Sequence, residues 1–272
     1  MHRMLRAVPS DRLAVLAATV TACRRCPRLV RWREEVPPRA AFQKERYWRR
    51  PVPGFGDPRA RVVVVGLAPA AHGANRTGRM FTGDRSGDWL YRSMWRAGLA
   101  NQAESRAADD GLELRGAWVT ASVRCAPPAN APTAEERAAC LGFLQEELSC
   151  FEDLRVVVAL GKLACDTVSL VYGVSPRPRF AHLAEHRLTD TTTLLCSYHP
   201  SQQNTFTKKL TEPMLDAVFA RARDLAAAAP ADAGSAPADA GSAPAAPAEV
   251  RPAGRPGAGP ASGPPSRASA CG

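Results

Sequence analysis

Residues 61–67 read RVVVVGL, and this stretch decides what fold to expect. Four consecutive valines are typical of a strand that is buried on both faces of a sheet. A loop crowded with small and polar residues follows at once, GLAPAAHGANRTGRMFTGD at 66–84, which we call the motif loop. In parallel sheets ligands bind beyond the carboxyl ends of the strands. The motif loop is therefore the first candidate for a functional site.

Strand and helix patterns alternate along the rest of the chain. Further apolar runs at 117–123, 155–160 and 192–197 predict three more strands. Helices are predicted at about 86–99 and from Thr133 towards Cys150, where TAEE at 133–136 forms a capping box. This alternation predicts an α/β protein, a three-layer α/β/α sandwich with a central, mostly parallel four-stranded sheet.

Composition divides the 272 residues into two parts. The stretch 230–272 is almost entirely Ala, Pro, Gly and Ser, and PADAGSA occurs in it twice in tandem. Such a segment cannot bury a core, so we expect a disordered tail there. Residues 1–229 are expected to form one domain.

The net charge of +10 is concentrated near the N-terminus, where residues 1–60 hold 14 Lys or Arg against 5 Asp or Glu. A basic surface with interleaved aromatic residues suits a phosphate backbone. Charge alone favours a merely solubilising face, and only the motifs described in this section favour DNA. The residues concerned are Arg24, Arg25, Arg28, Arg31, Arg33, Arg46, Arg49 and Arg50, with Trp32, Tyr47 and Trp48 among them.

An apolar stretch at 13–22 invites comparison with a signal peptide. Leu13, Leu16 and Val20 keep helical spacing, and Ser10 and Asp11 supply a helix N-cap before them, so an ordinary helix is the better interpretation. No stretch is long and apolar enough to span a bilayer. We expect a cytoplasmic protein without a membrane partner.

Eight cysteines are many for a reducing compartment, where a metal or a cluster explains paired thiols better than disulfides do. Cys23 and Cys26 form a CxxC, and Cys125 and Cys140 lie fifteen residues apart. This spacing fits four-cysteine zinc and an iron-sulfur cluster equally well. Cys150, on the same predicted helix as Cys140, competes for the fourth ligand position.

A second motif, SYHPSQQNTFT at 197–207, follows the last predicted strand. Together with the motif loop it resembles the signature motifs of the uracil-DNA glycosylase superfamily. The specific residues of the two motifs resemble those of family 5, also called type B, which is the iron-sulfur branch of the superfamily. The resemblance extends over about residues 23–223. The resemblance implies a [4Fe-4S] cluster on Cys23, Cys26, Cys125 and Cys140, which places Cys140 ahead of Cys150.

The resemblance also implies an activity. Such an enzyme is a monofunctional DNA glycosylase that flips uracil out of DNA and hydrolyses its N-glycosidic bond, leaving an abasic site. Family 5 handles other deaminated bases, so we expect hypoxanthine as a further substrate, in double-stranded DNA and as an alternative in single-stranded DNA. We expect a monomer that takes part in base excision repair.

Bond cleavage leaves negative charge on O2 of the base, so a hydrogen-bond donor must meet that atom. His199 is the candidate, assisted by backbone N–H groups of the turn at Gly66, Leu67 and Ala68. A histidine at a strand end that merely bonds the backbone is the alternative. Asp84 is the best-matched carboxylate to position water, with nearly equal weight for a role at the start of the next helix.

Recognition of the flipped base needs a stacking face and a group that reads its edge. Phe81 matches the stacking aromatic, although an isolated Phe is more often core. The chain has Ala121 where related families carry an edge-reading Asn, and Asn130 is the substitute, unless it only forms a turn. The residues expected to contact DNA near the flipped nucleotide are Arg76, Arg79, Gln202, Gln203 and Asn204. The alternative for Arg76 and Arg79 is that either is only a solvated charge.

Two other function classes compete with this interpretation. A non-catalytic iron-sulfur or zinc protein could keep the fold and bind DNA. A Rossmann enzyme with a nucleotide cofactor is disfavoured, because GLAPAAHG lacks the GxGxxG spacing.

Overall fold

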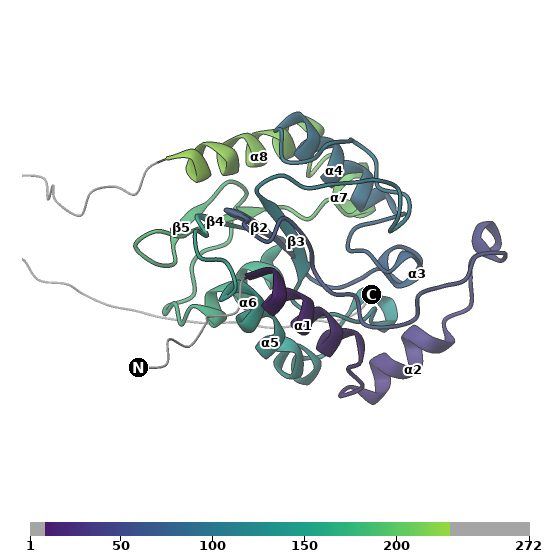
Figure 1. Ribbon diagram of the computed structural model, residues 1–272. Coiled ribbons are helices and arrows are strands. Elements are labelled where there is room, and N and C mark those ends of the chain that lie inside the picture. The colour runs from purple at the N-terminus through teal and green to yellow at the C-terminus, as the bar shows by residue number, and fades with distance from the viewer. Residues whose placement is uncertain (1–8, 229–272) are drawn as a thin grey trace, which may run out of the picture. The chain divides into compact units, whose positions relative to one another are not determined.

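The computed structural model describes residues 9–228, and the predicted tail at 230–272 lies outside them (Figure 1). The strands are β1 Phe55–Gly56, β2 Val62–Gly66, β3 Ala117–Ala121, β4 Val156–Leu160, β5 Glu185–Arg187 and β6 Thr193–Ser197. The α-helices are α1 Pro9–Thr21, α2 Pro27–Glu35, α3 Ala74–Thr77, α4 Arg85–Arg96, α5 Ala134–Leu148, α6 Lys162–Val171, α7 Gln202–Phe206 and α8 Glu212–Ala227. Two 3₁₀ turns, η1 Ala40–Phe42 and η2 Pro128–Asn130, complete the set.

The six strands form one sheet in the order β1-β3-β2-β4-β6-β5. The four predicted strands are its parallel centre, with Val64 of β2 paired to Val119 of β3 and Val158 of β4. The sheet has six strands, not four, because β1 and β5 add antiparallel edges. These edges are two and three residues long, too short to give a period-2 pattern, and β5 is polar throughout.

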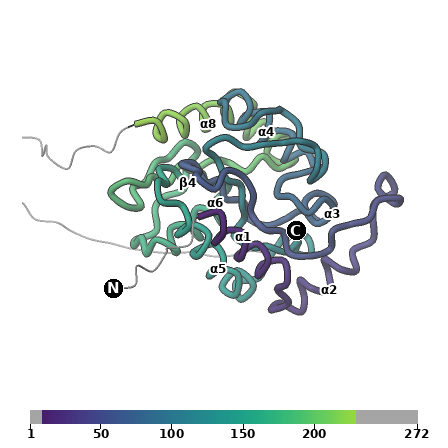
Figure 2. Tube along the Cα trace, in the orientation of Figure 1, coloured from purple at the N-terminus to yellow at the C-terminus, as the bar shows by residue number. Residues whose placement is uncertain are grey.

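Helices cover both faces of the sheet, as predicted (Figure 1, Figure 2). Helices α4 and α8 lie on one face, and α1, α5 and α6 lie on the other. Val62 and Val64 belong to the first of these cores, and Val63 and Val65 belong to the second. The valine run is buried because its alternating side chains fill both cores.

The capping box at the start of α5 is confirmed. Thr133 Oγ1 accepts from the Glu136 N–H at 3.2 Å, and Glu136 Oε2 accepts from the Thr133 N–H at 2.8 Å. Helix α1 begins at Pro9, so Ser10 and Asp11 lie in its first turn and do not cap it. Between residues 9 and 228, no helix combines the length and apolar character that crossing a membrane requires.

The parallel strands end at one edge of the sheet, and this edge carries the motifs. The motif loop leaves β2 at Gly66, and the second motif leaves β6 at Ser197. Backbone bonds join neighbouring strand ends, from Ser122 N to Gly66 O at 2.9 Å and from Gly161 N to Ser197 O at 2.8 Å. Segments that are more than 100 residues apart in sequence therefore meet there.

Candidate active site and cysteine pocket

His199 lies two residues beyond β6 and is held from several sides. Asn204 Nδ2 donates to the His199 carbonyl oxygen at 2.9 Å, which fixes the backbone of the second motif. The imidazole faces the Phe81 ring, with centroids 5.9 Å apart and planes inclined by 33°. Gly161, at the end of β4, leaves room beside the His199 Cβ. The second motif thus presents His199 to the motif loop.

The environment of His199 keeps its ring neutral. Burial lowers the pKa of His199 from 6.5 to about 4, with no charged partner contributing. Within residues 9–228 the ring nitrogens make no hydrogen bond. A strand-end histidine serving the backbone would use its ring for a bond, so this geometry favours the functional interpretation. The ring can donate an N–H to a bound molecule without placing a cation in the site.

Phe81 lies directly over the end of β2. A Cβ built on Gly66 would lie 2.6 Å from Phe81 Cζ, so only a glycine allows this approach. Phe81 itself has a φ of +53°, the left-handed region that a bulky residue rarely adopts. Ser122 fixes the Gly66 carbonyl oxygen with two bonds, from its N–H at 2.9 Å and its hydroxyl at 3.2 Å. Phe81 therefore lies between Gly66 and His199 and is close to both.

Asp84 is the N-cap of α4. Its Oδ1 accepts from the Gly87 N–H at 3.0 Å, which is the helix-terminus role weighed for it above. A Cβ on Gly73 would lie 2.0 Å from the other carboxylate oxygen, Oδ2, so Asp84 also contacts the middle of the motif loop. Burial raises the pKa of Asp84, partly offset by the capping bond. A role in positioning water remains a prediction.

The residues expected to read the base and enter the duplex are placed less uniformly. Asn130 is exposed, has a φ of +55° and donates its backbone N–H to Pro127 O at 3.2 Å, so its backbone forms a turn. A role of its side chain in reading the base stays a prediction. Gln202 and Gln203 are exposed in the first turn of α7. Asn204 is half-buried, and its side chain serves the backbone of His199.

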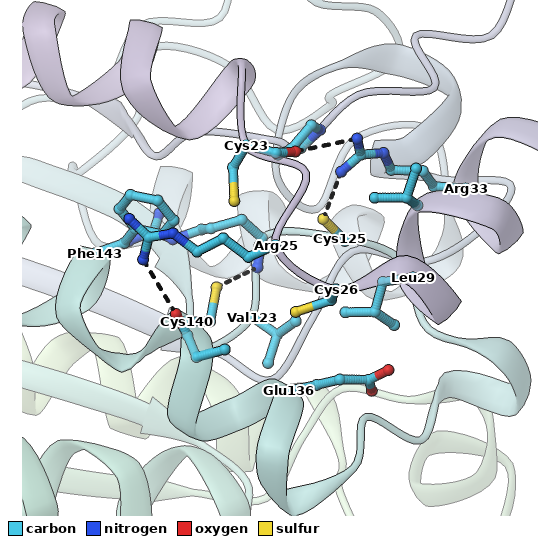
Figure 3. A pocket seen from close by; sticks show the side chains of 14 residues that line it. Cys23, Arg25, Cys26, Leu29, Arg33, Val123, Cys125, Glu136, Cys140 and Phe143 are labelled. Carbon is cyan, nitrogen blue, oxygen red and sulfur yellow. Dashed lines mark hydrogen bonds between the residues drawn. The ribbon is translucent and has the colours of Figure 1, made fainter.

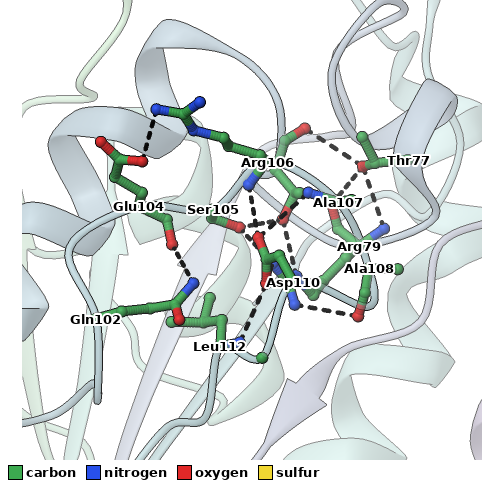
Figure 4. A network of polar contacts seen from close by, with 12 residues as sticks. Thr77, Arg79, Gln102, Glu104, Ser105, Arg106, Ala107, Ala108, Asp110 and Leu112 are labelled. Carbon is green, nitrogen blue, oxygen red and sulfur yellow. Dashed lines mark hydrogen bonds and ion pairs between the residues drawn. The ribbon is translucent and has the colours of Figure 1, made fainter.

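Arg79 lies inside the protein, contrary to the prediction of a phosphate contact (Figure 4). Its side chain is 7% exposed and bonds Asp110 at 2.7 Å, Ser105 at 2.8 Å and Thr82 at 3.0 Å. Its guanidinium pins the segment between α4 and β3 to the motif loop and is not available to DNA. Asp110 lies 31 residues away in sequence, so no local sequence pattern predicts the Arg79–Asp110 ion pair.

Arg76 is also occupied by the protein. It bonds the backbone oxygens of His72 and Gly83 at 2.9 Å each and lies 4.0 Å from the Phe42 ring centroid. With Glu45 as its ion-pair partner, it braces the motif loop. Phosphate contacts must therefore come from other cations.

The N-terminal arginines divide into two groups. Arg24 and Arg28 form ion pairs with Glu34 and Glu136, and Arg33 is buried. Of the eight arginines named above, four are exposed and make no ion pair among the described residues: Arg25, Arg31, Arg46 and Arg50. Arg49 is half-buried and donates to the Val36 carbonyl oxygen at 3.2 Å. One of these arginines contacts a neighbouring aromatic residue, since Arg50 Cζ lies 5.8 Å from the centroid of the Trp48 ring. The predicted basic surface is smaller than its sequence suggests.

The four predicted ligand cysteines line one pocket, which we call the cysteine pocket (Figure 3). Cys23 and Cys26 precede α2, Cys125 follows β3 and Cys140 lies on α5. Cys150 lies in a different core, where its thiol donates to Glu146 O at 3.3 Å. The structure thus gathers the set that the resemblance implied and leaves Cys150 out of it.

The donor chemistry of this pocket suits a bound cation or cluster. Burial raises the pKa of Cys125 to about 11 and also raises the pKa of Cys140 and Cys26. Binding of a metal or a cluster stabilises the thiolate form and so opposes this effect of burial. Arg33 donates to Cys125 Sγ at 3.0 Å, and the Arg124 N–H donates to Cys140 Sγ at 3.3 Å, as bonds to ligand sulfurs do.

A sequence model of the uracil DNA glycosylase superfamily matches residues 53–223. The chain belongs to this superfamily. A type-5 uracil-DNA glycosylase of Mycobacterium tuberculosis is 52% identical over 216 residues, covering 78% of this chain and 81% of the relative. A type-5 enzyme of Thermus thermophilus is 52% identical over 211 residues, covering 76% and 95%. One of Pyrobaculum aerophilum is 48% identical over 200 residues, covering 74% and 87%. The resemblance to family 5 is confirmed.

Two cation–aromatic pairs at the second motif were not predicted from the sequence. Arg85, the first residue of α4, lies 4.5 Å from the ring centroid of Phe206, which is 66% exposed. Lys209 lies 5.0 Å from the ring centroid of Tyr198, the neighbour of His199. The run FTKK at 206–209, directly after the second motif, was the signal that could have found them.

Proposed function

We propose that this chain excises uracil from DNA, hydrolysing the N-glycosidic bond and leaving an abasic site in base excision repair. One observation carries the proposal beyond family membership. A neutral His199, with no hydrogen bond to its ring within residues 9–228, faces the Gly66–Phe81 surface at the carboxyl edge of a parallel sheet. Ligands of such sheets bind at that edge.

His199 is the proposed donor to O2 of the departing base. As the glycosidic bond breaks, negative charge gathers on that oxygen, and a fixed donor stabilises it more than it stabilises the intact substrate. Asn204 acts as a positioning residue for His199 through the bond to its carbonyl oxygen. Backbone N–H groups of the turn at Gly66, Leu67 and Ala68 are the proposed assistants, since small side chains permit close approach.

Asp84 is proposed to position the water that attacks C1′ of the sugar, besides capping α4. The two roles are compatible, because one carboxylate oxygen serves the cap and the other faces Gly73. A dissociative cleavage asks little of a general base. A carboxylate with a raised pKa can therefore still position water when it is ionised at the pH of the reaction.

Recognition rests on a stacking face and on an opened duplex. We propose that the flipped base stacks on Phe81, that Asn130 reads its edge, and that Gln202 and Gln203 enter the duplex beside it. Because Ala121 stands where related families carry an edge-reading Asn, we propose that the pocket discriminates weakly between bases. Hypoxanthine and other deaminated bases are accordingly proposed as substrates, in double-stranded and single-stranded DNA.

We further propose that Cys23, Cys26, Cys125 and Cys140 hold a [4Fe-4S] cluster. Four cysteines line one pocket, which suits four-cysteine zinc and an iron-sulfur cluster alike, and membership of family 5 supports the cluster. When bound, the cluster cross-links α2 and its preceding CxxC to the segment after β3 and to α5. The functional unit proposed is a monomer of residues 1–229.

Incubation with a uracil-containing duplex tests the function directly. The duplex and an undamaged control of the same sequence are treated with the protein and then with alkali, which cleaves abasic sites. We expect free uracil and alkali-dependent cleavage at the uracil position only. Iron-loaded protein that binds both duplexes but releases no base would support the non-catalytic alternative instead.

A further inference from the structure

We propose that Arg33 and Asn75 are positioning residues that make the order of the motif loop depend on occupancy of the cysteine pocket. The inference rests on the proposed function and on the proposed cluster. It assigns to this cluster a mechanical task, which is to hold the loop that carries Phe81 and Asp84 in its catalytic shape.

Arg33 is a fully buried arginine at the edge of the cysteine pocket, with 2% of its surface exposed (Figure 3). Its Nη1 donates to Cys125 Sγ at 3.0 Å and its Nη2 donates to Cys23 O at 3.1 Å. One side chain thus joins two ligand-bearing segments that are about a hundred residues apart in sequence.

The burial of Arg33 calls for a negative partner. Its nearest carboxylate belongs to Glu34, at 3.5 Å and partly exposed. A buried guanidinium is costly unless a negative charge compensates it. Besides this carboxylate, Arg33 is held by the Cys125 sulfur and the Cys23 carbonyl oxygen, which belong to the two segments that the proposed cluster would join.

Asn75 connects Arg33 to the motif loop. It lies on α3, is 0% exposed, and its Nδ2 donates to the backbone oxygen of Arg33 at 3.1 Å. Its own backbone bonds Ala70 within the loop at 3.1 Å and accepts from the Arg49 N–H at 3.1 Å. The middle of the motif loop is thereby fixed to the residue that contacts Cys125.

The start of the motif loop is fixed to a cysteine segment as well. Ser122 N and Val123 N donate to Gly66 O and Leu67 O, both at 2.9 Å. These donors immediately precede Cys125, and Val123 and Ala68 belong to the same buried cluster as the four cysteines. The start and the middle of the motif loop are therefore anchored on segments that the proposed cluster would hold together. Release of the cluster should free both anchors.

Amide hydrogen exchange tests this coupling without relying on activity. Exchange over residues 66–84 is measured by mass spectrometry on the full chain, first with the cluster loaded and then after the cluster has been removed by a chelator. In the wild-type protein, we expect removal to raise exchange of the motif loop about tenfold or more, because its anchors are lost.

Two variants and a control locate the link. Asn75→Asp keeps the shape of the side chain but loses the N–H donor, so the loop should exchange fast with the cluster present, while cluster absorbance near ~400 nm is retained. Arg33→Met should lose its cluster about tenfold faster in air, as loss of a bond to a ligand typically does, and should loosen the loop. Arg28→Met is the control, since that α2 arginine bonds Glu136 and Ala131 and neither a thiol nor the loop.

Several outcomes would overturn the inference. Unchanged exchange of the motif loop on cluster removal would do so, as would a loosened loop in Arg28→Met equal to that in Arg33→Met. If Asn75→Asp does not fold, the wild-type comparison still decides. A wild-type chain that binds neither iron nor sulfide ends both the cluster assignment and this inference. Uracil excision is read separately, so a failed coupling would leave the proposed function standing.

Discussion

The substitution Gly66→Ala tests the proposed base pocket most sharply, because the structure fixes its effect. The added Cβ would lie 2.6 Å from Phe81 Cζ and 2.8 Å from Cε2, whereas carbon atoms in contact lie about 3.5 Å apart. The ring must retreat by about 1 Å. A misplacement of that size in a catalytic constellation costs on the order of 10²-fold in rate. We expect single-turnover uracil excision to fall by about that factor.

The assay is single-turnover cleavage of a uracil-containing duplex at saturating protein, with duplex affinity measured alongside. Overpacking should cost about 1–3 kcal/mol of stability, so the rate is measured well below the melting temperature of the variant. Gly142→Ala is the matched control, since a Cβ there meets nothing within 4 Å and its helix should gain up to about 1 kcal/mol. A Gly66→Ala variant that excises uracil at the wild-type rate would refute the placement of the pocket.

Three further predictions follow from burial and charge. An NMR titration should give His199 a pKa of about 4, and an ordinary pKa would disprove the expected burial effect. The unfolded chain takes up this proton near pH 6.5 and the folded chain only near pH 4, so the free energy of unfolding should fall by up to about 3 kcal/mol between these pH values. The variant His199→Gln should lack this loss. Replacing Arg46 and Arg50 by Gln should weaken binding to any duplex and reduce the salt slope by about 2, and an unaltered slope would place the DNA surface elsewhere. Deleting 230–272 should leave the melting temperature and single-turnover rate unchanged, and a loss of either would show that the domain extends into the tail.

The centre of the fold could be predicted because its signals are local. The valine run of β2 and the capping box at Thr133 each depend on residues within a few positions, and both are where the sequence predicts them. The edge strands β1 and β5 were missed because two or three residues carry no period, and their pairing depends on tertiary contacts.

The site was predictable where motifs carried it and not where distant partners did. The gathering of Cys23, Cys26, Cys125 and Cys140 followed from resemblance, since spacing could not choose between cofactors. Arg79 was misassigned because an arginine in a polar loop looks exposed until its partner, 31 residues away, is placed. The link between Arg33 and Asn75 likewise joins segments 42 residues apart and leaves no trace in either motif.

Single-turnover uracil excision by His199→Ala, beside the wild-type protein, measures the central claim most directly. If the wild-type chain releases uracil through a neutral His199 that donates to O2, the variant should lose on the order of 10²–10³ in rate, comparable to removal of an oxyanion-hole donor. Its affinity for the duplex should barely change, because the ring acts on charge that develops only during cleavage. Excision by His199→Ala at the wild-type rate would contradict the account.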